Sequence, residues 1–383
     1  MKVAGDWIET PATQAVCAML NDAGHQALFV GGCIRNALLR EPVSDIDIAT
    51  DALPERVIEL AENAGLKPVP TGLKHGTVTV VADHIPHEIT TFRKDVETHG
   101  RHAVVAFSDD IIDDARRRDF TMNALYAKAD GTLVDPLGGM DDLHARRVRF
   151  IDDAGQRIRE DYLRILRFFR FHAWYGDPLE GLDAEGLEAI AAHVDGLASL
   201  SRERIGAEIV KLLAAPDPAM SVAAMRHAGV MRAVLPGADD RYLAPLVHIE
   251  SDFGIAAEPL RRLACLGGED PVEPLRLSNT QARQLDLLRN EISSTKGAAE
   301  LGYRYGVKSG LDILILRSAL LEQRHDPESA QILEKGASSH FPIRAADLMP
   351  DYSGPALGAR LKELEQRWIA SDFSLTKEEL VRL

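Results

Sequence analysis

Two aspartates separated by a single residue, Asp45 and Asp47, are the side chains in this sequence most suited to chemistry. They alternate with Ile46 and Ile48, a pattern typical of a strand that buries one face in a core. On such a strand both carboxylates point to the same side, and their repulsion favours a cation between them. Carboxylate oxygens suit Mg²⁺, which keeps part of its coordination for phosphate oxygens. The alternative is a solvated strand end, which an isolated Asp-x-Asp is more often.

A glycine pair upstream supports the metal interpretation. Residues 27–30 form a short apolar run that stops at Gly31-Gly32, and residues 34–39 resume with helical character. This pattern predicts a strand, a glycine turn and a helix, in which backbone N–H groups approach a phosphate closely and the helix N-terminus faces its charge. Arg35, one turn inside the helix, adds a phosphate contact. A Gly-Gly pair alone is more often a plain turn.

The elements that must position these residues change in character along the chain. The first part mixes helix and strand, whereas the part beyond residue 157 has long amphipathic runs and few strand signals. The expected elements are a helix at 11–24, a strand at 43–50, a hairpin of strands at 77–82 and 87–92, and helices at 160–174, 202–214 and 311–323. We therefore expect an α+β protein whose N-terminal head contains a small mixed β-sheet and whose neck, body and tail are all helical. The expected domains are a head at 1–140, a neck at 141–200, and a body and tail at 201–383.

Composition limits the classes of function. The 383 residues carry a net charge of -15, which argues against a protein that coats nucleic acid non-specifically, because that affinity comes from Lys and Arg. RNA would have to bind a local basic face, and the central stretch supplies eight arginines for one: Arg146, Arg147, Arg149, Arg157, Arg159, Arg164, Arg167 and Arg170. Three scattered cysteines are too few for a disulfide framework or a Cys-based zinc site. With neither a signal peptide nor a membrane-spanning run in the sequence, we expect a cytoplasmic location.

Five motifs in order along residues 28–172 resemble a known family. The first is Phe29-Val30-Gly31-Gly32-Cys33-Ile34-Arg35 followed by Asp45-Ile46-Asp47; the others are His75-Gly76-Thr77-Val78 with Glu88-Ile89-Thr90-Thr91-Phe92-Arg93, Arg117-Arg118-Asp119-Phe120-Thr121-Met122-Asn123-Ala124, Asp135-Pro136-Leu137-Gly138-Gly139 with Asp142-Leu143, and Glu160-Asp161-Tyr162-Leu163-Arg164-Ile165-Leu166-Arg167. Together they resemble the class II tRNA nucleotidyltransferase and poly(A) polymerase family of the polymerase-β superfamily. The remaining half matches only in its helical character. Asn36 departs from the pattern, since the family commonly has Asp at this position.

The resemblance assigns roles to the residues of the head. It implies that Asp45 and Asp47 hold the catalytic Mg²⁺ ions, and that Gly32, Arg35 and Arg118 contact the nucleotide. The reaction is then phosphoryl transfer by positioning and charge neutralisation at a two-metal site.

Two further acidic residues of the head keep two interpretations each. Glu88 is either a third carboxylate or base, or a structural residue at a hairpin end. Asp119 either meets a ribose hydroxyl or pairs with Arg117.

The neck carries four charged residues at every third position, Asp161, Arg164, Arg167 and Arg170, on one predicted helix. Each step of three rotates by about 60°, so Asp161 and Arg164 lie side by side. A carboxylate accepts and a guanidinium donates, which matches the amino donor and ring-nitrogen acceptor of cytosine and adenine and not the reverse order of guanine and uracil. The alternative is a stabilising ion pair on a helix surface. The resemblance implies that Asp161 and Arg164 select the nucleotide and that Arg167 and Arg170 bind the triphosphate.

Two further sequence patterns give weaker evidence about function. His75-Gly76-Thr77 either resembles the family loop associated with switching from C to A addition or is a plain hairpin connection. His325-Asp326 has no partnering metal-ligand pattern, so we expect no appended phosphohydrolase activity.

The expected function is addition of C, C and A to the 3′ end of tRNA from CTP and ATP, with a tRNA-binding body and tail. The alternatives are a poly(A) polymerase, which would favour a basic C-terminal extension, and partial enzymes that add only CC or only A. A catalytically inactive RNA-binding protein and a small-molecule nucleotidylating enzyme are disfavoured by the intact motifs and by the long helical half. No obligate protein partner and no membrane partner is expected.

Overall fold

The computed structural model describes residues 1–99, 102–321 and 328–382, and the chain divides into two compact units, Met1–Pro236 and Gly237–Leu383. His325 and Asp326 lie outside the described residues. Among the described helices, none is long and apolar enough to cross a membrane.

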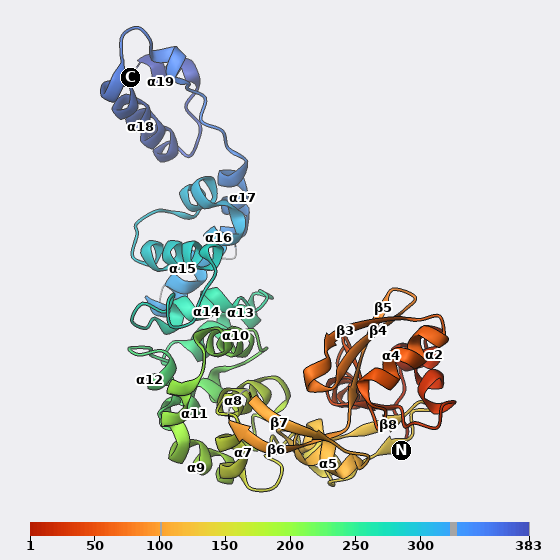
Figure 1. The fold of residues 1–383 in the computed structure, drawn as a ribbon. Coiled ribbons are helices and arrows are strands. Elements are labelled where there is room, and N and C mark those ends of the chain that lie inside the picture. The colour runs from red at the N-terminus through yellow and green to blue at the C-terminus, as the bar shows by residue number, and fades with distance from the viewer. Residues whose placement is uncertain (100–101, 322–327, 383) are drawn as a thin grey trace. The chain divides into compact units, whose positions relative to one another are not determined.

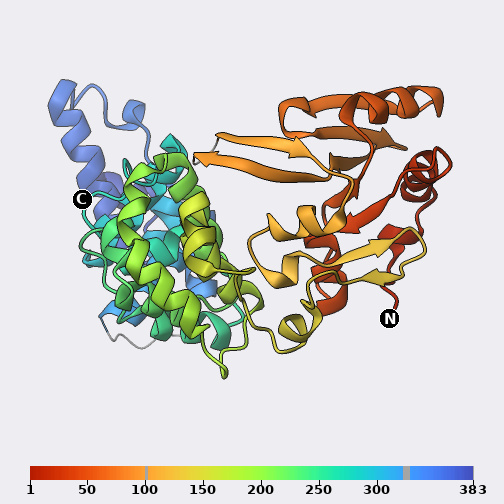
Figure 2. The ribbon, with the colours of Figure 1, turned by 60° about the horizontal axis from the view of Figure 1, so that its bottom comes forward.

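The first unit begins with the α+β head (Figure 1). Its helices and strands are α1 (Asp6–Glu9), α2 (Pro11–Asn21), β1 (Leu28–Val30), α3 (Gly32–Leu39), β2 (Ile46–Thr50), α4 (Pro54–Asn63), β3 (Lys67–Gly72), η1 (Leu73–His75), β4 (Thr77–Ala82), β5 (Ile85–Thr91), β6 (Arg93–His99), β7 (His102–Phe107), α5 (Ile111–Arg116), η2 (Thr121–Asn123), β8 (Tyr126–Lys128), β9 (Leu133–Val134) and α6 (Met140–His144). Seven strands form one sheet in the order β3-β4-β5-β2-β1-β8-β9, and β6 pairs with β7 as a separate two-stranded ribbon (Figure 2).

The sheet is mixed, as the sequence predicts. β2 pairs with β5 in parallel, whereas the other neighbours are antiparallel, and β4 and β5 form the predicted hairpin. Helices α2 and α4 pack against β4 and β5 and shield apolar side chains such as Val57 and Val80, which are fully buried. Pro11 at the first position of α2 begins that helix where the sequence predicts. The parallel pairing places Glu88 directly beside Asp47 in the register.

One boundary differs from the sequence prediction in a way that affects the site. Strand β2 begins at Ile46 and not at residue 43, so Asp45 precedes the strand. The edge strand β3 pairs with β4.

The second part of the first unit is helical. Its elements are α7 (Ala154–Glu160), α8 (Leu163–Tyr175), α9 (Ala184–His193), η3 (Val194–Ser199), α10 (Arg202–Leu213), α11 (Ala219–His227) and α12 (Val230–Val234). Phe168 of α8 stacks on Phe150 of the preceding segment, with ring centroids 5.5 Å apart, and Phe150 also contacts Phe120 of the head. This aromatic packing joins α8 to the sheet domain, so that residues on α8 face those of the head within one compact unit.

The second unit contains only helices in its described part. They are α13 (Leu243–Asp252), α14 (Pro259–Leu266), α15 (Asn279–Ile292), α16 (Ala298–Leu320), α17 (Ser329–Ser338), η4 (Ala345–Leu348), α18 (Gly354–Ala370) and α19 (Lys377–Arg382). At its C-terminal end Trp368 packs edge-on against Tyr303 and Phe373 in a small core of its own. The α+β head and the helical remainder confirm the predicted fold class.

Candidate active site

A cavity of about 420 Å³ in the first unit gathers residues from the head and from α8. Its walls are formed by Gly31, Gly32, Arg35, Asp47, Arg118, Asp119, Asn123, Asp161, Arg164, Arg167, Arg170 and Phe171. Of the site residues expected from the sequence, only Asp45 is absent from this wall. Residues more than 130 positions apart in the chain therefore form one site.

The glycine turn shapes one side of the cavity. Gly31 has φ 73° and ψ −121°, a conformation that strains any residue with a Cβ, and α3 begins at the next residue. A Cβ at Gly31 would lie 3.4 Å from Nη1 of Arg118. The turn therefore needs glycine for its backbone conformation.

Asp47 presents an unpaired carboxylate to this cavity. Within the described residues its side chain makes neither a hydrogen bond nor an ion pair, and burial, the charge of Glu88 and the charge of Asp45 raise its pKa to about 6 against the opposing effect of Arg118. Asp45 is exposed, and its Oδ2 accepts a hydrogen bond from Ser44 at 3.0 Å. Three acidic side chains thus lie close enough to repel one another, an arrangement that a bound cation relieves. No group of three or more metal-ligating side chains is already assembled in the described part of the chain.

Five arginines line the cavity. Arg118 donates to Asp114 at 2.9 Å and to the hydroxyl of Tyr126 at 3.1 Å. Burial raises the pKa of Asp114, whereas the charges of Arg118 and Arg117 lower it. The net effect lowers this pKa to about 2. This pairing holds the Arg118 guanidinium at the cavity in its charged form.

The arginines of α8 are held in the same way. Arg167 contacts Asp119 at 2.6 Å, and Arg170 donates from Nε to Glu208 of α10 at 2.6 Å. Asp119 is buried, yet Arg167 and a hydrogen bond from Asn123 outweigh burial and lower its pKa to about 2. The expected alternative in which Asp119 pairs with Arg117 is wrong, because Arg117 pairs with Asp114 at 2.8 Å.

Asp161 and Arg164 both line the cavity, but they do not share one helix as predicted. Helix α7 ends at Glu160 and α8 begins at Leu163, so Asp161 lies in the link with extended backbone angles, φ −151° and ψ 105°. Its Oδ1 accepts the backbone N–H of Leu163 at 3.1 Å, a local hydrogen bond that competes with helix continuation. The turn, rather than the pitch of a helix, therefore brings the two side chains to one wall.

The cavity also contains residues that the sequence did not single out. Phe171 follows Arg167 by four positions on α8 and lies under the guanidinium of Arg170, 4.7 Å from Cζ to the ring centroid. Asn123 belongs to the third motif and accepts from Arg35 at 2.5 Å. Helical spacing from Arg167 was the available signal for Phe171, whereas nothing local to Asn123 indicated its partner.

Comparisons with known proteins agree with this arrangement. Residues 27–149 match the model of the "Poly A polymerase head domain", and residues 182–241 match that of the "Probable RNA and SrmB-binding site of polymerase A". The mitochondrial CCA tRNA nucleotidyltransferase 1 of Mus musculus is 32% identical over 97% of this chain and 89% of the relative. The CCA-adding enzyme of Geobacillus thermodenitrificans is 32% identical over 95% of this chain and 93% of its own length.

The chain belongs to the CCA-adding tRNA nucleotidyltransferase family. Its fold resembles the crystal structure of the Bacillus stearothermophilus CCA-adding enzyme in complex with CTP, with a TM-score of 0.79 and 26% identity over 94% of this chain and 93% of that one. The Thermotoga maritima CCA-adding enzyme complexed with tRNA shares the fold at a TM-score of 0.69 and 18% identity, over 100% and 98% of the two chains. The family resemblance inferred from the five motifs is therefore confirmed.

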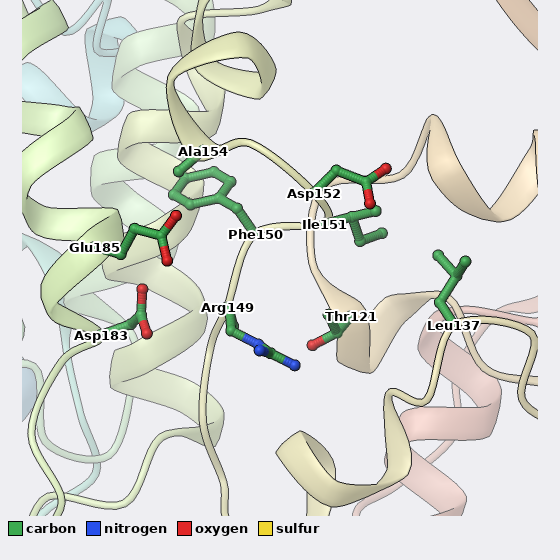
Figure 3. A pocket seen from close by; sticks show the side chains of 9 residues that line it. All are labelled: Thr121, Leu137, Arg149, Phe150, Ile151, Asp152, Ala154, Asp183 and Glu185. Atoms are coloured by element: carbon green, nitrogen blue, oxygen red, sulfur yellow. The ribbon is translucent and has the colours of Figure 1, made fainter.

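The first unit contains a second cavity, of about 290 Å³ (Figure 3). Asp183 and Glu185 line one side, Thr121 and Leu137 line the other, and Arg149 extends between them. Arg149 already donates to Asp142 at 2.8 Å. Since its walls carry three carboxylates, from Asp152, Asp183 and Glu185, and a single arginine, this cavity is less suited to a phosphate than the larger one with its five arginines.

Proposed function

We propose that the chain adds C, C and A to the 3′ end of tRNA from CTP and ATP. The observation that carries the proposal is that one cavity is lined at once by Asp47, by the glycine turn with its arginines, and by Asp161 with Arg164. These are the three components that template-independent transfer of a chosen nucleotide needs: a carboxylate for the metal, cations for the triphosphate and a group that reads the base. Membership of the family supports the choice of tRNA as the acceptor.

The triphosphate binds at the glycine turn and the arginine wall. Backbone N–H groups at the start of α3 and the guanidinium groups of Arg118, Arg167 and Arg170 offset its negative charge. The tRNA 3′-hydroxyl then attacks the α-phosphorus, the bond to the β-phosphate breaks, and pyrophosphate leaves. The protein contributes positioning and charge, since each arginine is already oriented by its carboxylate partner.

Asp45 and Asp47 fit a divalent cation. Their oxygens are the hard donors that Mg²⁺ prefers, and Asp47 has no protein partner to displace in the described part of the chain. Bound there, Mg²⁺ would offset phosphate charge and lower the pKa of the attacking hydroxyl. Glu88, beside Asp47, adds negative charge that strengthens the attraction for the cation.

Asp161 and Arg164 select the base. Arg164 donates from Nη1 to Arg157 O and Glu160, and from Nη2 to Arg117 O, which leaves Nε–H and one Nη2–H without partners in the described residues. Asp161 accepts from Arg204 at 2.6 Å and keeps further lone pairs. The pair therefore accepts an amino group and donates to a ring nitrogen, which fits cytosine and adenine. Guanine or uracil would leave polar groups unsatisfied.

We propose the domain limits on the same grounds: a catalytic head at 1–140, a nucleotide-selecting neck at 141–200, and a tRNA-binding body and tail at 201–383. The first compact unit continues through Pro236, because α10 packs against α8. On this proposal the beginning of the body supports the site, as Glu208 and Arg204 of α10 do.

The test is extension of defined tRNAs by the purified chain with Mg²⁺. Substrates lacking CCA, CA or A are each incubated with CTP, ATP, UTP or GTP and with the CTP and ATP mixture. Growth to CCA followed by arrest is the expected result. A long A tail would replace the proposal with poly(A) polymerase activity, and arrest after CC, or extension only of the substrate lacking A, would replace it with a partial enzyme.

A further inference from the structure

Five arginines line the larger cavity, and one of them differs from the other four. Arg118, Arg164, Arg167 and Arg170 each form an ion pair with a carboxylate, at 2.9, 2.7, 2.6 and 2.6 Å respectively. Arg35 has no carboxylate within ion-pair distance among the described residues, although it is only 6% exposed. A buried guanidinium without a counter-charge is costly, so its surroundings require an explanation.

Neutral groups hold Arg35 instead. Its Nη1 donates to Asn123 Oδ1 at 2.5 Å, and its Nη2 donates to Asn36 Oδ1 at 2.8 Å and to the hydroxyl of Tyr175 at 2.9 Å. Nε also donates to Asn36, at 3.2 Å. The guanidinium lies over the Tyr175 ring, 4.0 Å from Cζ to the centroid, which stabilises the cation without neutralising it.

Asn36 is oriented so that it must present its oxygen to Arg35. Its Nδ2 donates to the carbonyl oxygen of Pro42 at 2.8 Å, and a carbonyl only accepts while a guanidinium only donates. An aspartate here would set a carboxylate against both groups, forming an ion pair with Arg35 and losing the bond to Pro42. The amide is therefore the side chain that fixes the guanidinium and leaves its charge intact.

One N–H of Arg35, on Nη1, has no partner in the described residues, and Arg35 lines the cavity beside Gly32. Burial lowers the pKa of Arg35 against the opposing effects of Tyr175 and of the more distant charge of Asp119, and a bound anion in direct contact would oppose burial further. An anion in the cavity would thus gain more from Arg35 than from an arginine that already has a carboxylate partner.

We propose that Asn36, Asn123 and Tyr175 are positioning residues that hold Arg35 at the cavity wall through neutral contacts, so that its unneutralised charge binds the phosphate chain of the incoming nucleotide. The inference rests on the proposed function only in taking that anion to be a triphosphate. Asn36, where the family commonly has Asp, makes this a property of the present chain.

The test measures binding of inorganic tripolyphosphate, CTP and ATP by isothermal titration calorimetry at one fixed Mg²⁺ concentration, with no RNA present. Asn36→Asp should weaken all three ligands by about tenfold, because the new carboxylate neutralises Arg35. Asn36→Ala removes the two hydrogen bonds from Arg35 and the one to Pro42 without adding charge, and it should weaken binding of the three ligands only about two- to threefold. The loss in Asn36→Asp should shrink at high salt, where charge effects are screened.

Tyr175→Phe keeps the aromatic ring and removes one acceptor, so it should weaken the three ligands equally, by about two- to threefold. Tyr305→Phe is its matched control, because it removes a hydroxyl that donates to Glu291 at 2.8 Å in the second unit. That control should bind all three ligands as the unchanged chain does.

Unchanged tripolyphosphate affinity in Asn36→Asp would overturn the inference, as would equal losses in Asn36→Asp and Asn36→Ala. A loss confined to CTP and ATP would also overturn it, since the base rather than the phosphates would then be affected. Because the assay contains no RNA, failure of tRNA extension would remove the proposed function while the expected binding pattern still supported the role of Arg35.

Discussion

Each compact unit contains a cluster of arginine and carboxylate groups. The two clusters share their residue types but differ in their surroundings. In the first unit the cavity-wall cluster, made of Arg118, Arg164, Arg167 and Arg170 with their carboxylates, borders an open cavity. In the second unit the sealed cluster consists of Glu250, Arg261, Arg262 and Asp312, all 2% exposed or less.

The two clusters differ in how fully their N–H groups are used in hydrogen bonds within the protein. In the sealed cluster Arg261 donates to Glu250 at 2.8 Å, to Asp312 at 2.5 Å and to Ala256 O at 2.6 Å, and Glu250 also accepts from Arg262 at 2.7 Å. Burial raises the pKa of Asp312 against the effect of Arg261. In the cavity-wall cluster, by contrast, Arg164 lines the cavity and keeps N–H groups without partners in the described residues. Pairing in the sealed cluster thus serves the fold, whereas on the proposed function pairing in the cavity-wall cluster orients charge for the nucleotide.

The largest effect should come from the acidic residues at the cavity. Asp47→Ala, like Asp45→Ala, should lower nucleotide addition by on the order of 10³-fold or more while leaving the fold intact, because the cation and the phosphates lose their ligand. Single-turnover extension of tRNA lacking A, together with circular dichroism, measures both effects. Exposed Asp109→Ala in the same unit is the control. Near-normal turnover in either variant would end the assignment of this site.

Substitution in the sealed cluster should lower stability and leave ligand binding unchanged. Arg261→Met leaves Asp312 without its cation and Glu250 with only part of its charge offset, which should destabilise the second unit by about 3–5 kcal/mol. Urea denaturation measures the loss, with Arg283→Met on the exposed side of α15 as the control. Affinity for tripolyphosphate should not change. A variant with normal stability and weakened ligand binding would break the contrast between the two clusters.

The next prediction concerns Asp161 and the selectivity among nucleotides. Asp161→Ala removes the acceptor for the amino group of cytosine and adenine, so the preference for CTP and ATP over UTP and GTP should fall by about 100-fold. The ratio of kcat/KM values for each nucleotide measures it. Asp153→Ala removes a helix-capping aspartate of the same region and is the control, because its side chain accepts from Gln156 N and does not line the cavity. Full preference for CTP and ATP in Asp161→Ala would refute the reading of the base by this pair.

The smallest effect concerns the cost of leaving Asp47 unpaired. Its pKa is raised to about 6 from 3.8, so the fold disfavours its ionised form, and the protein loses stability as pH rises between these two values. In metal-free buffer Asp47→Asn should therefore stabilise the fold by about 1–2 kcal/mol at pH 7 and by close to nothing at pH 4. Denaturation at several pH values measures this difference. A variant less stable than the parent at pH 7 would mean that Asp47 has a stabilising partner, like the carboxylates of the sealed cluster.

Local pattern was sufficient for much of the head. The run ending at Gly31-Gly32, the alternation around Asp47 and the hairpin at 77–82 and 87–92 each depend on neighbours within a few residues. The errors arose where a short-range hydrogen bond competed with periodicity. Asp161 was placed on a helix by its spacing from Arg164, yet its carboxylate caps the following backbone and interrupts the helix.

The sequence alone predicts the mixed head and the helical remainder, because strand alternation, glycine turns and amphipathic runs are encoded over short distances. The family and the residue types of the site follow from the resemblance of the five motifs. Only the tertiary structure decided which charges meet. The motif predicts that Arg35 contacts the phosphates, but its neutral partners Asn123 and Tyr175 lie 88 and 140 residues away. Such pairings depend on how α8 packs against the sheet, and long-range packing leaves no periodic signal in the chain.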